Sequence, residues 1–145
     1  MAITQAITNS FKQELLQGDH DFDNGTDVFK LSLYTSAATL NSSTTVYTST
    51  NEIAASGQYS AGGGTLVNTG TSQVGGVAFC DFSDLSFTGV TLTARGALIY
   101  NTSATVGNAA VAVLDFGADK TATSGTFTVV FPANTSAAAI LRISG

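Results

Sequence analysis

The stretch ARGALIYNTSATVGNAAVAVLDFGADKTATSGTFTVVF, residues 94–131, decides the fold of this chain. It holds three runs rich in β-branched, aromatic and other apolar residues, separated by polar connections, at residues 94–100, 109–116 and 126–131. In the last run Phe127, Val129 and Phe131 occupy alternate positions, which is the two-residue period of a half-buried strand, and the only proline, Pro132, follows it. The stretch therefore predicts three successive antiparallel strands.

Similar apolar runs on either side of this stretch predict further strands. They lie at residues 28–34, 65–68, 77–82, 85–88 and 138–143, with residues 90–100 as a strand bent at Gly96 and a short edge strand near Val46. The total of eight or nine short strands is typical of an all-β fold, a jelly-roll-like antiparallel β-sandwich.

The first of these strands, at residues 28–34, alternates apolar and polar side chains. Its apolar members are expected to face the core, and they are Phe29, Leu31 and Leu33. Lys30 and Ser32 fall on the other side of the pleat and are expected to face outward.

Two other segments suggest close contact with neighbouring backbone or with another subunit. Residues 138–143 are apolar on both faces except at Arg142, which predicts a strand covered on both sides, inside a sheet or under a partner subunit. The glycine-rich segment 57–64 does not run from a strand into a helix, so a phosphate-binding loop is not indicated. Its glycines predict a mobile hairpin or a place where two backbone segments approach closely.

The N-terminal segment carries the one helical pattern of the sequence. Ile3, Ile7, Phe11 and Leu15 recur every four residues, and Gly18 follows as a left-handed cap. We therefore expect residues 1–18 to form an N-terminal helical arm and residues 19–145 to form a single β-sandwich domain. The helix is expected to pack either on its own sandwich or on a neighbouring subunit.

Composition restricts the possible functions. A chain of 145 residues has room for one domain, and since only 10% of the residues are charged, small polar residues must cover its surface. The net charge is −5 and the basic residues are scattered, which argues against a nucleic-acid partner.

Cys80 is the only cysteine, so no intrachain disulfide is possible. Because no apolar run approaches the roughly 20 residues that cross a bilayer, and the start lacks the features of a signal peptide, we expect no membrane partner and synthesis in a cytoplasm.

Residues 19–27, with the sequence DHDFDNGTD, place carboxylates at alternate positions, as the opening of a calcium-binding loop does. Two positions depart from that pattern. Asn24 stands where the loop needs glycine, and Lys30 stands where a bidentate glutamate would close the site. The alternative is a solvated turn that leads into the next strand. Calcium between Asp19 and Asp27 stays an open alternative, and we assign no metal ligands.

Catalytic chemistry finds little support in the sequence. His20 is the only histidine and so the only base of its kind for a nucleophilic mechanism. Asp81, Asp84 and Asp115 lie in or beside predicted strands and are the carboxylates that a hydrolase could use. The favoured alternative is that each is a turn or hydrogen-bonding residue. We therefore predict a protein that is not an enzyme, with no catalytic, cofactor-binding or metal-binding residues.

Arg95 stands in an otherwise uncharged stretch. If it is buried, its guanidinium needs an acidic partner, for which Asp81 and Asp115 are the candidates, and a contact across a subunit boundary is the alternative. Cys80, beside Phe79 on a predicted strand, is expected to be a small buried hydrophobic residue.

Four segments of the sequence resemble a family of small structural proteins from tailed bacteriophages. They are NSFKQELL at residues 9–16, FKLSLYTSAATL at 29–40, ARGALIYN at 94–101 and VLDFGADKT at 113–121. Within that group the chain is most similar to the capsid cement, or decoration, proteins. The resemblance implies a jelly-roll sandwich that sits as a homodimer or homotrimer on the outside of the head shell, binds the major capsid protein and is located in the virion. It supplies no active-site residues.

Two other functions stay open at this point. A virion appendage or tail component could recognise host-surface glycans through loops around Tyr47, Gln58, Tyr59 and Asn101, and a hydrolase could use the three aspartates named above. The tyrosines are better explained individually, as core or interface aromatics from four separate segments: Tyr34, Tyr47, Tyr59 and Tyr100.

Overall fold

The computed structural model describes residues 2–23 and 25–145. Its elements, in chain order, are β1 (Ala6–Ile7), α1 (Asn9–Leu16), β2 (Phe29–Tyr34), β3 (Gly64–Thr65), β4 (Asn68–Val74), β5 (Val77–Phe82), β6 (Leu85–Asn101), β7 (Ala109–Val129) and β8 (Leu141–Ser144). The helix among these residues is too short to span a membrane.

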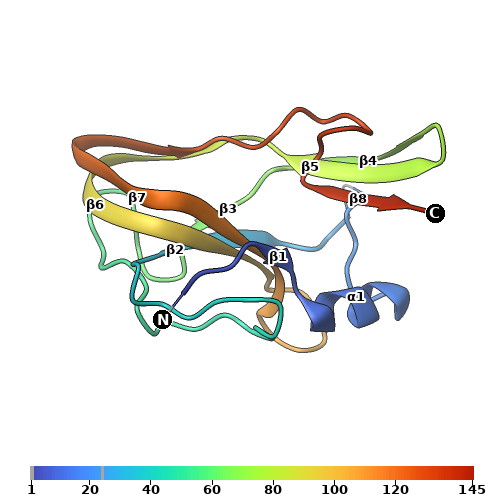
Figure 1. Cartoon of the computed structure of the whole chain (residues 1–145), viewed down its shortest axis with the longest axis horizontal. Helices are drawn as coiled ribbons and strands as arrows, with labels where there is room; N and C mark the ends of the chain where they lie inside the picture. Colours follow the sequence, from blue (N-terminus) through green and yellow to red (C-terminus); the bar gives the residue numbers. More distant parts are fainter. Residues whose placement is uncertain (1, 24) are drawn as a thin grey trace.

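The strands form two antiparallel sheets that pack together (Figure 1). The larger sheet has the strand order β1-β7-β6-β2-β3, and the smaller one has the order β4-β5-β8. This arrangement confirms the predicted fold class, an all-β antiparallel sandwich with one short helix near the N-terminus.

Strands β6 and β7 are much longer than predicted, because four expected short strands join into two. The runs at 85–88 and 90–100 both belong to β6, while most of the runs at 109–116 and 126–131 belongs to β7. The pairing adapts through bulges instead of stopping: between Asp115 and Lys120, four residues of β7 lie opposite the single residue Arg95. At the end of the molecule far from the C-terminus both strands turn over, so that their two halves lie in opposite layers (Figure 1).

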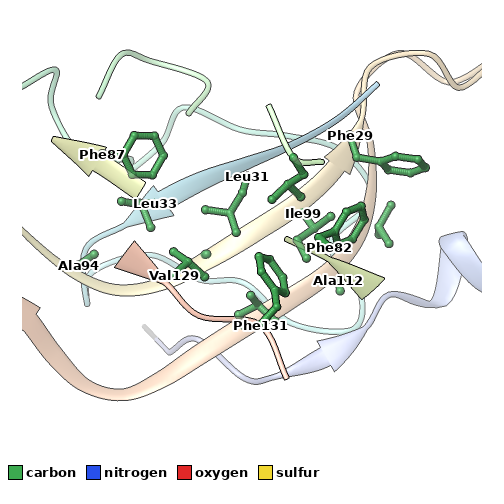
Figure 2. Close-up of a cluster of buried hydrophobic side chains, with 14 of the residues drawn as sticks. Phe29, Leu31, Leu33, Phe82, Phe87, Ala94, Ile99, Ala112, Val129 and Phe131 are labelled. Atoms are coloured by element: carbon green, nitrogen blue, oxygen red, sulfur yellow. The ribbon is translucent and has the colours of Figure 1, made fainter. Parts of the chain in front are cut away.

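The main core lies between these layers. Phe127, Val129 and Phe131 are 7%, 5% and 7% exposed, which confirms that these alternate positions face the core, although Phe131 lies just beyond the end of β7. Figure 2 shows Val129 and Phe131 pointing into the same cluster as Leu31 of β2 and Ile99 of β6. Since burial of one such side chain contributes roughly 1.5–3 kcal/mol, this cluster is the main source of stability.

The other face of β2 is also covered, which corrects the prediction for Lys30 and Ser32. Ser32 is fully buried and its hydroxyl donates to Tyr34 Oη at 3.0 Å, while Lys30 is half-buried. The reason is that the polar segment 35–63 folds over this face, where Leu40 packs in a second apolar cluster with Tyr34. The edge strand expected within this segment is reduced to a single bridge between Val46 and Ala109.

The N-terminal helix begins later than its sequence pattern predicts. Ile3 forms a bridge with Leu40, and Ile7 belongs to β1, which pairs with Ala112 and Val113 of β7. The helix starts after Thr8, whose side chain accepts a hydrogen bond from the backbone N–H of Phe11 as an N-cap. Phe11 is 3% exposed within the main core, so the helix packs on its own sandwich.

The C-terminal strand is not covered on both sides within the chain, contrary to one of its two predicted environments. Within residues 2–23 and 25–145, β8 pairs with β5 alone and forms an edge of the smaller sheet. Leu141 is buried, but Ile143 is 61% exposed and Arg142 is also exposed.

The glycine-rich segment is a place of close backbone approach, as one of its two interpretations predicted. Gly63 has a φ of +80°, and a Cβ atom there would lie 1.7 Å from the carbonyl oxygen of Leu31. A Cβ atom on Gly57 would lie 2.1 Å from the carbonyl oxygen of Gly89. Side chains at these two positions are therefore excluded by backbone contact.

Candidate functional site

The four tyrosines do not act separately, because the structure gathers them around Glu52. Glu52 Oε2 accepts a hydrogen bond from Tyr47 Oη at 2.6 Å, and Oε1 accepts from Tyr59 Oη at 2.8 Å and from the backbone N–H of Gly62 at 2.7 Å. Of the other two tyrosines, Tyr100 stacks on Tyr47 and donates to the carbonyl oxygen of Gly62 at 2.6 Å, and Tyr34 donates to the carbonyl oxygen of Thr48 at 2.6 Å. Such bonds to a charged acceptor are about twice as strong as neutral ones, so Glu52 anchors the covering segment.

The phenol groups of this cluster are held in their neutral form. Burial raises the pKa of Tyr34 and of Tyr100 to about 12, and the charge of Glu52 acts in the same direction. For Tyr47 and Tyr59, burial is again the largest cause of a raised pKa, and Glu52 raises it further. At neutral pH the four hydroxyls therefore serve as hydrogen-bond donors and not as bases.

His20 is part of a second buried polar network, which joins α1 to the end of β6. Its Nε2 lies 3.0 Å from Glu14 Oε1, and its Nδ1 accepts from the amide of Asn101, also at 3.0 Å. The same amide donates to Asp27 Oδ2 at 2.8 Å, and its oxygen accepts from the backbone N–H of Ser103. This pattern places the ring proton of a neutral His20 on Nε2, where it is donated to Glu14.

The surroundings of His20 explain why it is not available as a base for an external substrate. The side chain is fully buried, and its ring lies against Phe11 and Phe22. Both ring nitrogens already have partners within the chain. The network is therefore a structural link between elements.

The carboxylates of the proposed calcium loop bind separate parts of the chain. Asp19 Oδ1 accepts from the backbone N–H and the hydroxyl of Thr105, and these bonds lower the pKa of Asp19. Asp23 accepts from the hydroxyl of Thr71, and Asp27 accepts from the backbone N–H of Asp21. Across residues 2–23 and 25–145 no group of three or more His, Cys, Asp or Glu side chains could hold a metal ion. Asn24, at the position that departs from the calcium pattern, lies outside the described residues.

The three aspartates considered for hydrolysis have three different environments. Asp81 is 1% exposed, and its Oδ2 makes no well-formed hydrogen bond within the part of the chain that the structure describes. Asp84, between β5 and β6, accepts from the backbone N–H of Phe131 at 2.8 Å and so acts as a hydrogen-bonding residue between distant segments. Asp115 faces Arg95, and its Oδ1 also accepts from the backbone N–H of Gly117.

Arg95 is paired with one of its two predicted partners. Its Nε lies 3.5 Å from Asp115 Oδ1, and its Nη1 lies 3.9 Å from Asp119 Oδ1, across the bulge of β7. The Arg95 side chain is 37% exposed, so solvent screens the pair and its contribution to stability is small.

The residues suggested for glycan recognition do not share one surface. Tyr59 and Asn101 are fully buried, and their polar atoms are bound within the chain. Gln58 is exposed, and its side chain accepts from the backbone N–H of Thr88. Tyr47 is half-buried beside Glu52.

An apolar cleft between α1 and the smaller sheet was not predicted. Its cavity has a volume of about 150 Å³, and its walls include Phe11 and Leu15 of α1, Ala78 and Cys80 of β5, and Leu141 and Ile143 of β8. We call it the α1–β8 cleft. Cys80 is 6% exposed, which confirms it as a buried hydrophobic residue, and burial raises the pKa of its thiol to about 12.

Sequence reasoning missed the cleft because its walls come from segments far apart in the chain. The available signal was the last strand, whose apolar residues on both faces predicted either an interior position or a partner subunit. Glu52 was missed for a related reason: a single acidic residue in a Ser/Thr-rich segment does not reveal that three donors converge on it.

No protein-family model, curated protein or solved structure matches the chain.

Proposed function

We propose that this protein is a structural component of a bacteriophage virion, a capsid cement protein that binds the outside of the head shell. In this role it bridges neighbouring capsomers, with the major capsid protein and further copies of itself as partners. The observation that carries the proposal is that the central polar side chains are bound within the chain while apolar side chains are exposed. Glu52 and His20, which stand at the centres of the two polar clusters, are bound within the chain, whereas large apolar side chains remain exposed.

The exposed apolar residues suit a protein that binds others through several patches. They are Leu16 at 91%, Val130 at 72%, Val67 at 64%, Ile143 at 61% and Val74 at 58% exposure. The molecule exposes 6974 Å², and a standard interface removes about 800 Å² from each partner, so two or three such contacts are feasible. Simultaneous contacts raise occupancy through effective concentration.

The long β6–β7 ribbon supports a mechanical role. The two halves of this ribbon lie in opposite layers of the sandwich, so that paired backbone, with bulges at several positions, runs from one layer into the other (Figure 1). A load applied between two surface contacts would act on this ribbon and on the core together. The net charge of −5 also disfavours adhesion to the packaged genome.

The proposal is tested by mixing the purified protein with expanded capsids and measuring bound copies per particle. A cement protein should bind with a stoichiometry that matches the symmetry of the shell and should raise the temperature at which the shell opens. Mass spectrometry of mature particles should detect the protein, and its absence from them would overturn the proposal.

A further inference from the structure

The end of the molecule that carries the C-terminus combines a projecting apolar side chain with an apolar cavity. Figure 1 shows α1 below β5 and β8 at this end. Leu16, the last residue of α1, is 91% exposed, and it directly follows Leu15, which lines the α1–β8 cleft. Ile143, which also lines the cleft, is 61% exposed.

We propose that two copies of this chain associate about a two-fold axis, with Leu16 of each copy inserted into the α1–β8 cleft of the other. This inference rests on the self-association included in the proposed function and names the surface that carries it. A contact about a two-fold axis needs a patch that is complementary to itself, and a projection beside a cavity has that property.

The size and chemistry of the cavity fit a leucine side chain. An apolar cavity of about 150 Å³ accepts a group as large as benzene, and the four carbons of a leucine side chain are smaller. The walls are the apolar side chains of Phe11, Leu15 and Leu141 with the thiol of Cys80, whose burial keeps it uncharged. A lysine side chain would lose its hydration there and would also meet the positive charge of Arg142, which lines the cleft too.

The charges at this end also favour a second copy. Arg142 is the charged residue that lines the cleft, and its guanidinium is exposed while it donates to the carbonyl oxygen of Ala137. The inserted end has the opposite sign, because the last turn of α1 contains no basic residue and the helix dipole places negative charge there. Asp19, three residues after Leu16, adds a carboxylate. Insertion therefore brings negative charge toward Arg142 of the receiving copy.

The free edge of β8 lies beside the same contact. Among the described residues β8 has β5 as its one neighbouring strand, so its other side is an edge of the smaller sheet, where a second strand can pair. If the two β8 strands approach antiparallel about the axis, centred on Ile143, the two Arg142 side chains do not lie opposite one another. The cleft and the edge can therefore contribute to one continuous interface.

The test is sedimentation velocity of the full chain over a range of concentrations, with four single variants. Wild-type protein should be a dimer, and Leu16→Lys should weaken dimerisation at least tenfold, because a buried apolar anchor is replaced by a positive charge that meets Arg142 of the receiving copy. Ile143→Lys should act in the same direction, and Leu16→Met should retain the dimer. Val130→Lys is the matched control, since Val130 is 72% exposed and does not line the cleft.

Leu16 is 91% exposed within its own chain, so a failure of Leu16→Lys to dimerise cannot be attributed to misfolding, and a thermal unfolding curve verifies this. A monomeric wild-type protein, a trimer, or a dimer unaffected by Leu16→Lys would overturn the inference. Loss of the dimer in Val130→Lys as well would also overturn it, because added charge at any exposed site would then explain the effect. A monomer that still decorated capsids would leave the proposed function standing, so the two proposals fail separately.

Discussion

At the scale of single residues, Asp81 is a carboxylate whose charge the fold disfavours. It is 1% exposed, and its Oδ1 accepts from the backbone N–H of Phe82, while its Oδ2 makes no well-formed hydrogen bond to a residue of 2–23 or 25–145. Burial raises the pKa of Asp81 above its ordinary value of 3.8 and outweighs the backbone N–H groups of Phe82 and Ile140, which lower it, and the nearby charge of Asp84 also raises it. The folded state therefore binds a proton here more tightly than the unfolded state does.

The raised pKa fixes the sign of a pH dependence. The contribution of Asp81 to stability is fully present below pH 3.8 and is lost as the pH rises through its folded-state pKa. Asp81→Asn carries no charge at any pH, so its free energy of unfolding should improve relative to wild type as the pH increases from 3.8 toward neutrality. Urea unfolding of both proteins across this range measures the difference. A difference that moves in the opposite direction would show that Asp81 is stabilised as a carboxylate.

Glu52 is the residue whose replacement should affect the covering segment most. In Glu52→Gln an amide NH2 group, which is a donor, replaces one carboxylate oxygen. The two tyrosine hydroxyls and the Gly62 N–H are donors as well, so at least one of the three hydrogen bonds to the carboxylate is lost. Because bonds to charged groups contribute about 1.5–3 kcal/mol each, we expect a loss of about 2 kcal/mol in the free energy of unfolding. Tyr47→Phe, which removes one donor and leaves the carboxylate bound by two others, should cost less. Equal losses in the two variants would contradict the central role of the carboxylate.

Residue types and their neighbours predicted some of these environments and not others. The burial of Cys80 was predicted, and Asp115 was one of the two candidate partners of Arg95, because a small apolar thiol in a strand and an isolated charge each have few stable environments. The tyrosine cluster was not, since its members lie in four segments that only the complete fold brings together. Periodicity describes which face a residue occupies, but it does not identify the residue on another segment that meets it.

At the scale of elements, the start of α1 shows how one pattern can fit two structures. The four-residue spacing from Ile3 to Leu15 satisfies a helix, but Ile3 and Ile7 are β-branched and serve equally well in extended backbone. Thr8 decides between the two. Its hydroxyl both caps the helix and donates to the carbonyl oxygen of Ala110, which holds the preceding segment against β7.

The strands show that an element can also be missed when its residues are mostly polar. Strands with an apolar buried face, such as β2 and β5, were predicted to within one residue, whereas β4 has the sequence NTGTSQV and only its final residue is strongly apolar. The middle of β7 is likewise polar and mostly exposed, yet its backbone pairs with β6. Hydrogen bonding along a long ladder does not require apolar side chains, so composition alone ends such a strand too early.

The turn that precedes β3 allows a prediction about backbone contact. In Gly63→Ala the new Cβ atom meets the carbonyl of Leu31, so β2 and the turn must separate, and the φ of +80° adds strain. Gly76→Ala is the matched control, since Gly76 has a φ of +82° and no atom within 4 Å of an added Cβ. The control should lose about 1–2 kcal/mol, from the positive φ alone, and Gly63→Ala should lose clearly more, as thermal unfolding would show. Equal losses would mean that the backbone contact at Gly63 relaxes without cost.

At the scale of the whole molecule, the sequence predicted the sandwich and its main core, but it did not predict how far the buried apolar clusters extend. The apolar faces of the runs at 28–34 and 126–131 predicted a common core, and Leu31 and Val129 share that core. What the pattern could not show is that segment 35–63 adds a second apolar cluster on the outer face of the larger sheet. In such a polar segment, the few residues that pack on the sheet, such as Leu40, can be identified only when the surface beneath the segment is known.

The N-terminal segment tests whether the molecule behaves as one cooperative unit. Ile3 is buried in the second cluster and Phe11 in the main core, while β1 pairs with β7, so the segment contacts both clusters. Deleting residues 1–7 removes Ile3, the β1 pairing and the support for the cap at Thr8. Removal of a buried isoleucine alone costs about 2–5 kcal/mol, so the shortened chain should unfold at a much lower temperature, in a single transition. An arm that folded independently of the sandwich would give an unchanged midpoint on deletion. That result would contradict the continuous packing of α1, β1 and the two sheets on which the α1–β8 cleft depends.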